Sequence, residues 1–224
     1  MLFKSSLKLN PVHAHAPTLA IGNPAALAIL LLAGLIPLLF YFWLHDPDLT
    51  RENGPLEWLQ VVLLIGAVEA HAIHAARLPR STAGFVLSSG MSALALAFAL
   101  REIDVMEFGS SEFFRVLEAA VQVIKIAIGV GLLVFVASRL SQLLKSLPGV
   151  LKQPLYSISL AAGFLLLFTI PFDDNAFGLH GGLSRFIEEA LELASYALLF
   201  IAAMTHGPTA SQLVNPPLAR HADN

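Results

Sequence analysis

Six apolar stretches, each close to twenty residues long, limit the folds that this chain can adopt. They cover residues 24–44, 57–76, 82–100, 116–140, 155–172 and 186–205. A helix needs about 20 apolar residues to cross the ~30 Å hydrocarbon core of a bilayer. Only 13% of the chain is charged, whereas about a quarter of a soluble domain is. We therefore predict an all-α integral membrane bundle of six transmembrane helices, spanning residues 24–206.

The basic residues orient this bundle. Eight of them fall on the side of the N-terminus, namely Lys4, Lys8, Arg77, Arg80, Arg139, Lys145, Lys152 and Arg220. Four fall on the opposite side, namely Arg51, Arg101, Arg115 and Arg185. The positive-inside rule assigns the richer side to the cytoplasm. We therefore predict cytoplasmic tails at residues 1–23 and 207–224, and most acidic residues then lie on the outer side.

Composition excludes several classes of function. The chain has no cysteine, so disulfides, thiolate metal sites and cysteine nucleophiles are ruled out. Its basic residues are scattered rather than clustered, and we expect no nucleic-acid partner. The sequence contains neither a glycine-rich phosphate loop nor a G-x-S-x-G nucleophile motif. The partner that the composition implies is the lipid bilayer, while a homo-oligomer or a membrane-protein partner stays open.

Two patterns predict packing rather than function. Gly84, Ser88 and Ser92 recur every four residues in the third apolar stretch, and such a strip of small residues lets helices approach closely. Residues 141–152 have leucines at helical spacing with lysines on other faces. This amphipathic segment is expected to lie along the inner membrane surface.

A polar stripe runs down the fourth apolar stretch. Arg115, Glu118, Gln122 and Lys125 recur at spacings of three, four and three, which places them on one face of a helix. At ~1.5 Å per residue, Lys125 lies roughly 14 Å below the outer boundary. Ionisable groups at that depth are costly unless paired or hydrated. The stripe therefore either makes ion pairs between helices or lines a hydrated cavity open to the outside.

Partners for Lys125 occur at matching depth. The sixth stretch carries Glu188 and Glu192 on one face, with Glu189 on a neighbouring face. We expect Lys125 to pair with Glu192, because the fourth and sixth stretches both carry continuous polar stripes. Glu69 in the second stretch is the alternative.

Acidic residues also end the third stretch, in the run Arg101-Glu102-Ile103-Asp104. Carboxylates at a helix C-terminus oppose the helix dipole, so another group must stabilise them. Arg101 or Arg115 is the expected counter-ion, and a bound cation is the other option. Glu57 and Glu188, by contrast, begin helices, where the dipole favours a carboxylate.

A divalent metal is a further option. Asp173, Asp174 and His180 could bind zinc or another transition metal, and hard cations prefer several oxygen ligands. The run does not match the calcium-loop template. His71 and His74 are interpreted as polar packing residues or as residues close to the inner interface. Axial ligation of a haem, which needs two histidines on facing helices, is the other option.

The segments Arg51–Trp58 and Arg101–Asp104, with Glu188, Glu189 and Glu192, resemble a loose group of small multi-pass proteins of the bacterial inner (plasma) membrane. In that group an acidic segment opens one span, an Arg-Glu pair ends the next and a Glu-rich segment opens the last. The resemblance implies the same location and no particular activity. It implies that the Arg-Glu and Glu-Glu motifs belong to a shared site.

We therefore expect an outer, carboxylate-rich cavity that binds or moves a cation, a proton or a basic small solute. The expected site residues are Glu57, Arg101, Glu102, Asp104, Arg115, Glu118, Gln122, Lys125, Glu188, Glu189 and Glu192. One alternative is a metal-dependent membrane enzyme that acts on a lipid. The other is a non-catalytic accessory subunit of a membrane complex.

Overall fold

The computed structural model describes residues 24–173, 176–179 and 181–205, and the predicted tails lie outside this part of the chain. All regular structure in the described residues is helical, which confirms the all-α prediction. The long helices are α1 (Pro24–His45), α2 (Pro55–Ala76), α3 (Ala83–Arg101), α4 (Glu112–Ser138), α6 (Pro154–Leu167) and α8 (Gly181–Met204). The short helices are η1 (Pro47–Thr50), η2 (Val105–Phe108), α5 (Leu140–Val150) and α7 (Ile170–Asp173).

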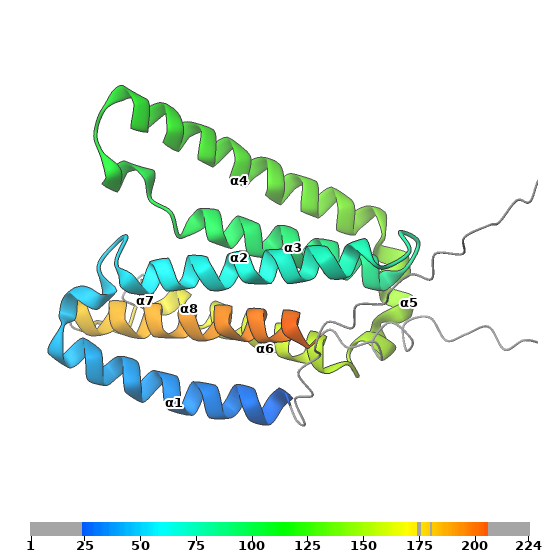
Figure 1. Ribbon diagram of the computed structural model, residues 1–224, viewed down its shortest axis with the longest axis horizontal. Helices are drawn as coiled ribbons and strands as arrows, with labels where there is room; N and C mark the ends of the chain where they lie inside the picture. Colours follow the sequence, from blue (N-terminus) through cyan, green and yellow to red (C-terminus); the bar gives the residue numbers. More distant parts are fainter. Residues whose placement is uncertain (1–23, 174–175, 180, 206–224) are drawn as a thin grey trace, which may run out of the picture.

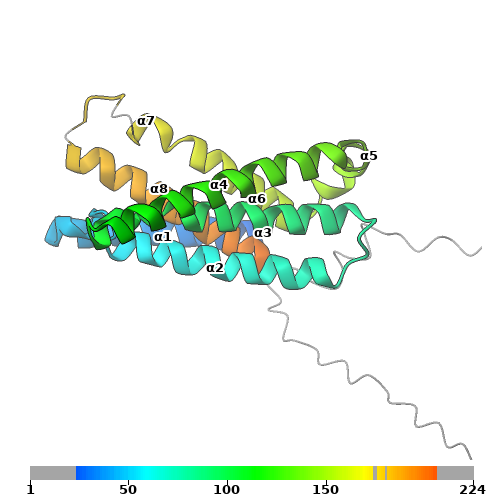
Figure 2. The same cartoon turned by 90° about the horizontal axis from the view of Figure 1, so that it is seen from above.

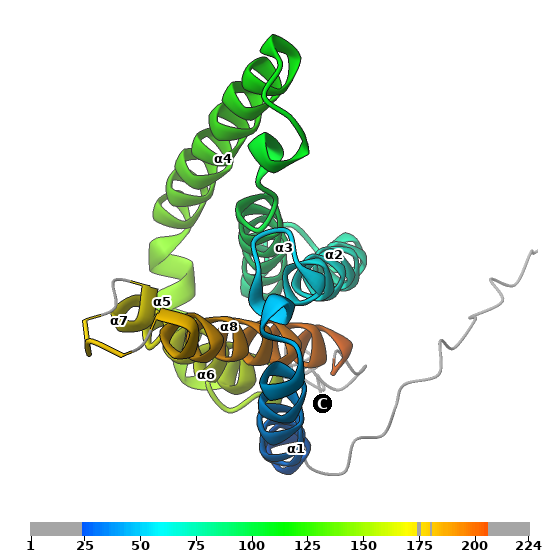
Figure 3. The same cartoon turned by 90° about the vertical axis from the view of Figure 1, so that its left-hand side faces the viewer.

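The long helices run roughly parallel to one axis of the molecule (Figures 1 and 2). Viewed along that axis, α8 lies between α1, α6 and the α2–α3 pair (Figure 3). The main core is formed by apolar residues of α2, α3, α6 and α8, including the fully buried Leu64 and Tyr196. A smaller cluster joins α1 and α2 to α8 through Leu39, Phe186 and Leu193.

Four segments are long and apolar enough to cross a membrane, namely Pro55–Ala76, Ala83–Arg101, Glu112–Ser138 and Pro154–Asp173. They correspond to the second, third, fourth and fifth predicted spans, and they indicate a membrane protein. In α1 the apolar part found is the shorter Leu32–His45. The 24-residue α8 is long enough but carries four charged residues in its first half.

The fifth predicted span, 155–172, is two helices rather than one. The α6 helix ends at Leu167, and α7 begins at Ile170. Pro171 explains this break, because proline has no N–H to donate and its ring clashes with a preceding helical turn. The interruption places α7 at the same end of the bundle as the start of α8 (Figure 2).

The predicted small-residue strip of α3 contacts α2. Gly84 and Ser88 are buried, and the Ser92 hydroxyl donates a hydrogen bond of 3.0 Å to the carbonyl of Val68 in α2. The amphipathic segment 141–152 is helical as predicted over most of its length. Its Gln142 side chain donates to the carbonyl of Ser81, which fixes α5 beside the α2–α3 turn.

The position of α4 differs from the prediction. No residue of α4 is buried, and the helix contacts α3 and η2 while leaning away from the rest of the bundle (Figure 3). The α4 and α8 helices therefore do not turn their polar faces toward each other.

Candidate functional site

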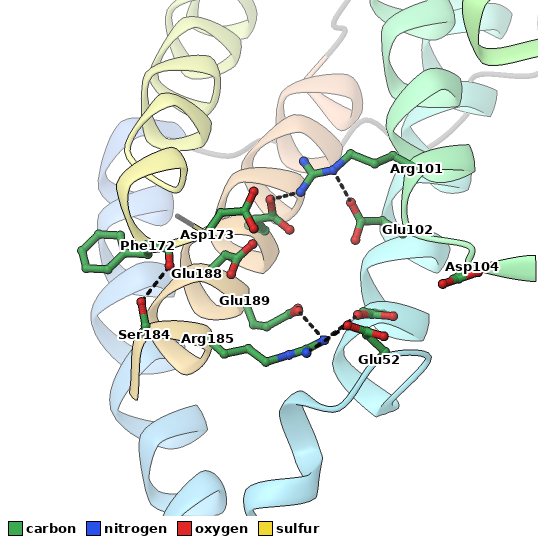
Figure 4. Close-up of a pocket in the computed structure, with 12 residues that line it drawn as sticks. Glu52, Arg101, Glu102, Asp104, Phe172, Asp173, Ser184, Arg185, Glu188 and Glu189 are labelled. Atoms are coloured by element: carbon green, nitrogen blue, oxygen red, sulfur yellow. Dashed lines mark hydrogen bonds and ion pairs between the residues drawn. The ribbon is translucent and has the colours of Figure 1, made fainter. Parts of the chain in front are cut away.

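A cavity of about 440 Å³ lies at the end of the bundle where α3 ends and α2 and α8 begin. Its walls come from α2, α3, α7, α8 and the adjoining loops (Figure 4). It is lined by Glu52, Glu57, Arg101, Glu102, Asp104, Phe172, Asp173, Ser184, Arg185, Glu188, Glu189 and Glu192. Eight carboxylates thus face two guanidinium groups. The volume falls within the ~300–1,000 Å³ range of small-molecule sites.

A tight corner before α2 positions Glu57 at the cavity wall. Asn53 has a φ of 51°, and a Cβ at Gly54 would collide with the carbonyl of Arg51. Pro55 occupies the first turn of the helix, where a missing N–H costs nothing. The Asn53 backbone N–H then donates to a Glu57 carboxylate oxygen at 2.5 Å. The Asn53 side chain bonds the carbonyl of Asp104 at 3.0 Å and so joins the two loops.

Arg101 joins the end of α3 to α8. Its Nη2 lies 2.5 Å from Oε1 of Glu192, and its Nε lies 4.0 Å from Oε1 of Glu102. The Glu192 side chain is 3% exposed, whereas that of Arg101 is 48% exposed. The hydroxyl of the fully buried Tyr196 donates a hydrogen bond of 2.8 Å to Glu102. Arg101 is therefore the counter-ion of Glu102, one of the two options that the sequence left open.

These contacts correct the prediction that Lys125 pairs with Glu192. The carboxylate of Glu192 is bonded to Arg101 instead. The pKa of the Glu102 carboxyl is raised to about 7, chiefly because burial disfavours its charged form and also because the Glu192 carboxylate lies close. The Arg101 guanidinium and the Tyr196 hydroxyl oppose this rise.

Arg185, on α8, forms a second charged centre. Its guanidinium lies 3.2 Å from Glu52, 3.6 Å from Glu57 and 4.0 Å from Glu189. Below it, Nε2 of Gln60 donates to a Glu189 carboxylate oxygen at 2.9 Å. Gln60 is fully buried on α2 and is not among the lining residues, so this bond ties Glu189 of α8 to α2.

Sequence reasoning missed Arg185, Glu52, Ser184 and Phe172 as lining residues. It counted Arg185 as an outer-loop charge that orients the bundle. The spacing of four between Arg185 and Glu189 was the signal that could have assigned Arg185 to the acidic face of the helix.

Three lining carboxylates, those of Asp104, Asp173 and Glu188, make no ion pair within the described residues. The Asp104 carboxylate instead accepts a hydrogen bond from the Met106 N–H. Within the described residues, neither Glu188 nor Asp173 has a hydrogen bond or an ion pair to a basic group. Glu188 is half-buried and lies close enough to Asp173 and Glu192 for their charges to repel. Figure 4 shows the carboxylates of Asp173 and Glu188 turned into the cavity. The arrangement suits a ligand that brings positive charge.

The structure does not bring the α4 residues to this cavity. Arg115 pairs with Glu112 on its own helix, and the Gln122 amide donates to Glu118 at 2.6 Å. Lys125 is half-buried and has no ion pair within the described residues. Arg115 and Gln122 are exposed, whereas Glu118, like Lys125, is half-buried. The α4 helix packs on α3 and η2 and makes no extensive contact with α8. Glu69, the alternative partner of Lys125, is exposed on α2.

The predicted metal ligands are only partly described. Asp173 lines the cavity, while Asp174 and His180 lie outside the described residues. Among the described residues, carboxylate oxygens of Glu52, Asp104 and Glu107 lie within 4.8 Å of one another, and all three residues are exposed. This donor set consists of oxygens alone, which suits calcium or magnesium better than zinc. His71 is 1% exposed in the bundle, as expected for a packing residue.

Comparisons with protein families, with curated proteins and with solved structures found no match to this chain. The class of this protein is therefore assigned from its own fold and cavity. It is an all-α membrane protein with a carboxylate-lined cavity at one end of its helices.

Proposed function

We propose that this chain is a multi-pass protein of the bacterial inner membrane. Its carboxylate cavity binds or moves a cation, a proton or a basic small solute. In this proposal the bundle has six spans, both termini are cytoplasmic and the cavity opens to the outer side. The resemblance to small inner-membrane proteins with Arg-Glu and Glu-Glu motifs agrees with this assignment.

The dimensions of α1 and α8 support six spans. The α1 helix has 22 residues, which corresponds to about 33 Å and is enough to cross the hydrocarbon core. The charged residues of α8 face the cavity rather than lipid, and its turns from Glu189 to Leu199 are almost entirely buried by neighbouring helices. Charges inside a bundle are accepted where they are paired or reach a water-filled cavity.

The observation that carries the binding proposal is the uncompensated pair of carboxylates, Asp173 and Glu188. The buried acids of the cavity, Glu102, Glu189 and Glu192, contact Arg101 or Arg185. Glu188 is half-buried and Asp173 is exposed at the cavity wall. An ammonium group or metal ion beside Asp173 and Glu188 would remove their mutual repulsion. A cavity with one sign of charge also raises the local concentration of oppositely charged solutes.

Titration of the purified protein in neutral detergent tests this proposal. Ethylammonium, sodium and magnesium chlorides would be added separately at constant ionic strength, with binding followed by calorimetry. At least one cation should bind, and Glu188→Gln should weaken that binding at least tenfold. Glu69→Gln is the matched control, since Glu69 is an exposed helical glutamate outside the cavity. Absence of binding, or equal binding by both variants, would refute the proposal.

A metal-dependent membrane enzyme is the second candidate, and the oxygen group of Glu52, Asp104 and Glu107 favours it. In that case the purified protein should contain a stoichiometric divalent metal. Elemental analysis of wild type against Glu107→Gln measures this directly, because Glu107 does not line the cavity.

The third candidate is an accessory subunit of a larger membrane complex. The absence of buried residues in α4 favours it, since a partner helix could cover this surface. A monodisperse, stable chain purified alone would count against it.

A further inference from the structure

A second hollow adjoins the carboxylate cavity. It is a groove of about 410 Å³ between α3, α6, α7 and α8. Most of its lining is apolar, with Leu94, Phe98, Leu166 and Leu199 among the side chains. Arg101 and Asp173 line both the groove and the carboxylate cavity. The two hollows therefore adjoin at these two side chains, one hollow charged and the other apolar.

We propose that the two hollows form one binding site for a phospholipid with a primary-amine head group. The ammonium group would lie among the cavity carboxylates, the phosphate at Arg101 and an acyl chain in the groove. This inference rests on the proposed function and specifies its ligand.

The charged half fits a phosphoethanolamine head. An ammonium group has three N–H donors, and Asp173 and Glu188 offer carboxylates that no described cation occupies. Arg101 stands where the two hollows meet, and its side chain is 48% exposed. Its guanidinium has five N–H donors, of which one makes a hydrogen bond to Glu192. Donors remain for a phosphate, which guanidinium groups bind well.

The apolar half fits an acyl chain. The hydroxyls of Ser159 and Thr169 are the polar groups on its α6 side, and both donate to carbonyls of their own helical segment, at 2.9 and 2.8 Å. The wall from Met91 to Arg101 rises roughly 15 Å along α3. Leu167 and Ile170 at its border are exposed, so the groove is open toward the bilayer.

Gly163 keeps the groove open. A Cβ at this position would have no atom within 4 Å, so the glycine borders empty space. A transmembrane helix is a poor occupant, because a helix about 10 Å across would need roughly three times the groove volume over the same 15 Å. An acyl chain is far thinner.

The head-group chemistry separates aminophospholipids from other lipids. An anionic glycerol head would be repelled by the excess of carboxylates. A trimethylammonium head has no N–H to donate and is usually bound by a cage of aromatic rings. Phe172 is the aromatic residue of the cavity lining, and its ring points away from the carboxylates in Figure 4.

The test is a titration of the detergent-purified chain with lysophosphatidylethanolamine, below its micellar concentration. Lysophosphatidylcholine and lysophosphatidylglycerol test the head group, and glycerophosphoethanolamine tests the head without a chain. We expect lysophosphatidylethanolamine to bind at least tenfold more tightly than each of these three. Equal affinity for the three lysolipids, or for the head with and without its chain, would overturn the inference.

A groove-filling variant tests the position of the chain. Gly163→Leu should weaken lysophosphatidylethanolamine binding at least tenfold while leaving ethylammonium binding unchanged. Gly129→Leu is the matched control, because Gly129 is an α4 glycine with open space around its Cβ position and lies outside both hollows. Thermal unfolding of both variants checks that they fold, and the wild-type lipid series decides the question if either does not.

The outcomes also separate this inference from the proposed function. If a small cation binds and Glu188→Gln weakens it, but the lysolipids bind alike and Gly163→Leu has no effect, the cavity function stands and the lipid site is wrong. If neither small cations nor lysophosphatidylethanolamine bind, both proposals are wrong.

Discussion

The ion pair between Arg101 and Glu192 gives an asymmetric prediction for protein stability. Removing one partner of a buried ion pair costs about 3–5 kcal/mol when the remaining charge cannot reach water. Glu192 is 3% exposed, so Arg101→Met would strand a buried carboxylate. Because Arg101 is half-exposed and water already screens the pair, we reduce the expected loss to about 2–3 kcal/mol. Glu192→Met should cost only about 1 kcal/mol, because the remaining guanidinium can hydrate.

Thermal unfolding in detergent measures this difference. For a chain of this size 1 kcal/mol corresponds to roughly 2–4 °C, so Arg101→Met should lower the Tm by roughly 4–12 °C. The double variant Arg101→Met with Glu192→Met should recover most of that loss, because an apolar pair leaves no buried charge. Arg115→Met is the control, since the side chains of Arg115 and its partner Glu112 are 64% and 75% exposed. Equal losses for the two single variants, or a double variant no more stable than Arg101→Met, would contradict this reasoning.

Two further predictions concern packing and pH. Gly66→Ala should destabilise the protein by about 1–2 kcal/mol, because its Cβ would lie 2.7 Å from the Phe200 ring of α8 and overpacking outweighs the gain in helix propensity. Gly163→Ala, with open space around it, should instead stabilise by about 0.5–1 kcal/mol, as chemical or thermal unfolding would show. The pKa of Glu102 is raised to about 7 from an ordinary 4.5, so the folded protein favours the protonated carboxyl. The stability that this protonated group contributes to the fold is fully present below pH 4.5 and is lost as the pH rises through 7. Glu102→Gln should flatten this dependence and be more stable than wild type at pH 8 by on the order of 3 kcal/mol, and an unchanged pH profile would refute the assignment.

Local features of the fold could be predicted because they depend on neighbouring residues. The apolar stretch 57–76 predicted α2 to within two residues of its start, and the small residues of α3 predicted a close helix contact. Apolar length predicted the helices themselves. The break before α7 was missed because Pro171 lies within an apolar run that looks continuous in composition.

The site could be predicted only in part, because helical spacing identifies a face but not the neighbour that it meets. The stripe with Lys125 belongs to α4, yet this helix packs on α3 and η2 and makes no extensive contact with α8. The Arg101-Glu102 pair was found because acids at a helix C-terminus require a counter-ion. Arg185 was missed because its charge was used to assign the orientation of the bundle.

The peripheral position of α4 has a practical consequence. None of its side chains is buried, none lines either hollow, and the chain has no cysteine. A cysteine placed at the exposed Ser110, just before this helix, would be the single thiol available for a fluorescent or spin label. Such a probe would report on the end of the molecule that holds the cavity while leaving every residue of that cavity in its native form.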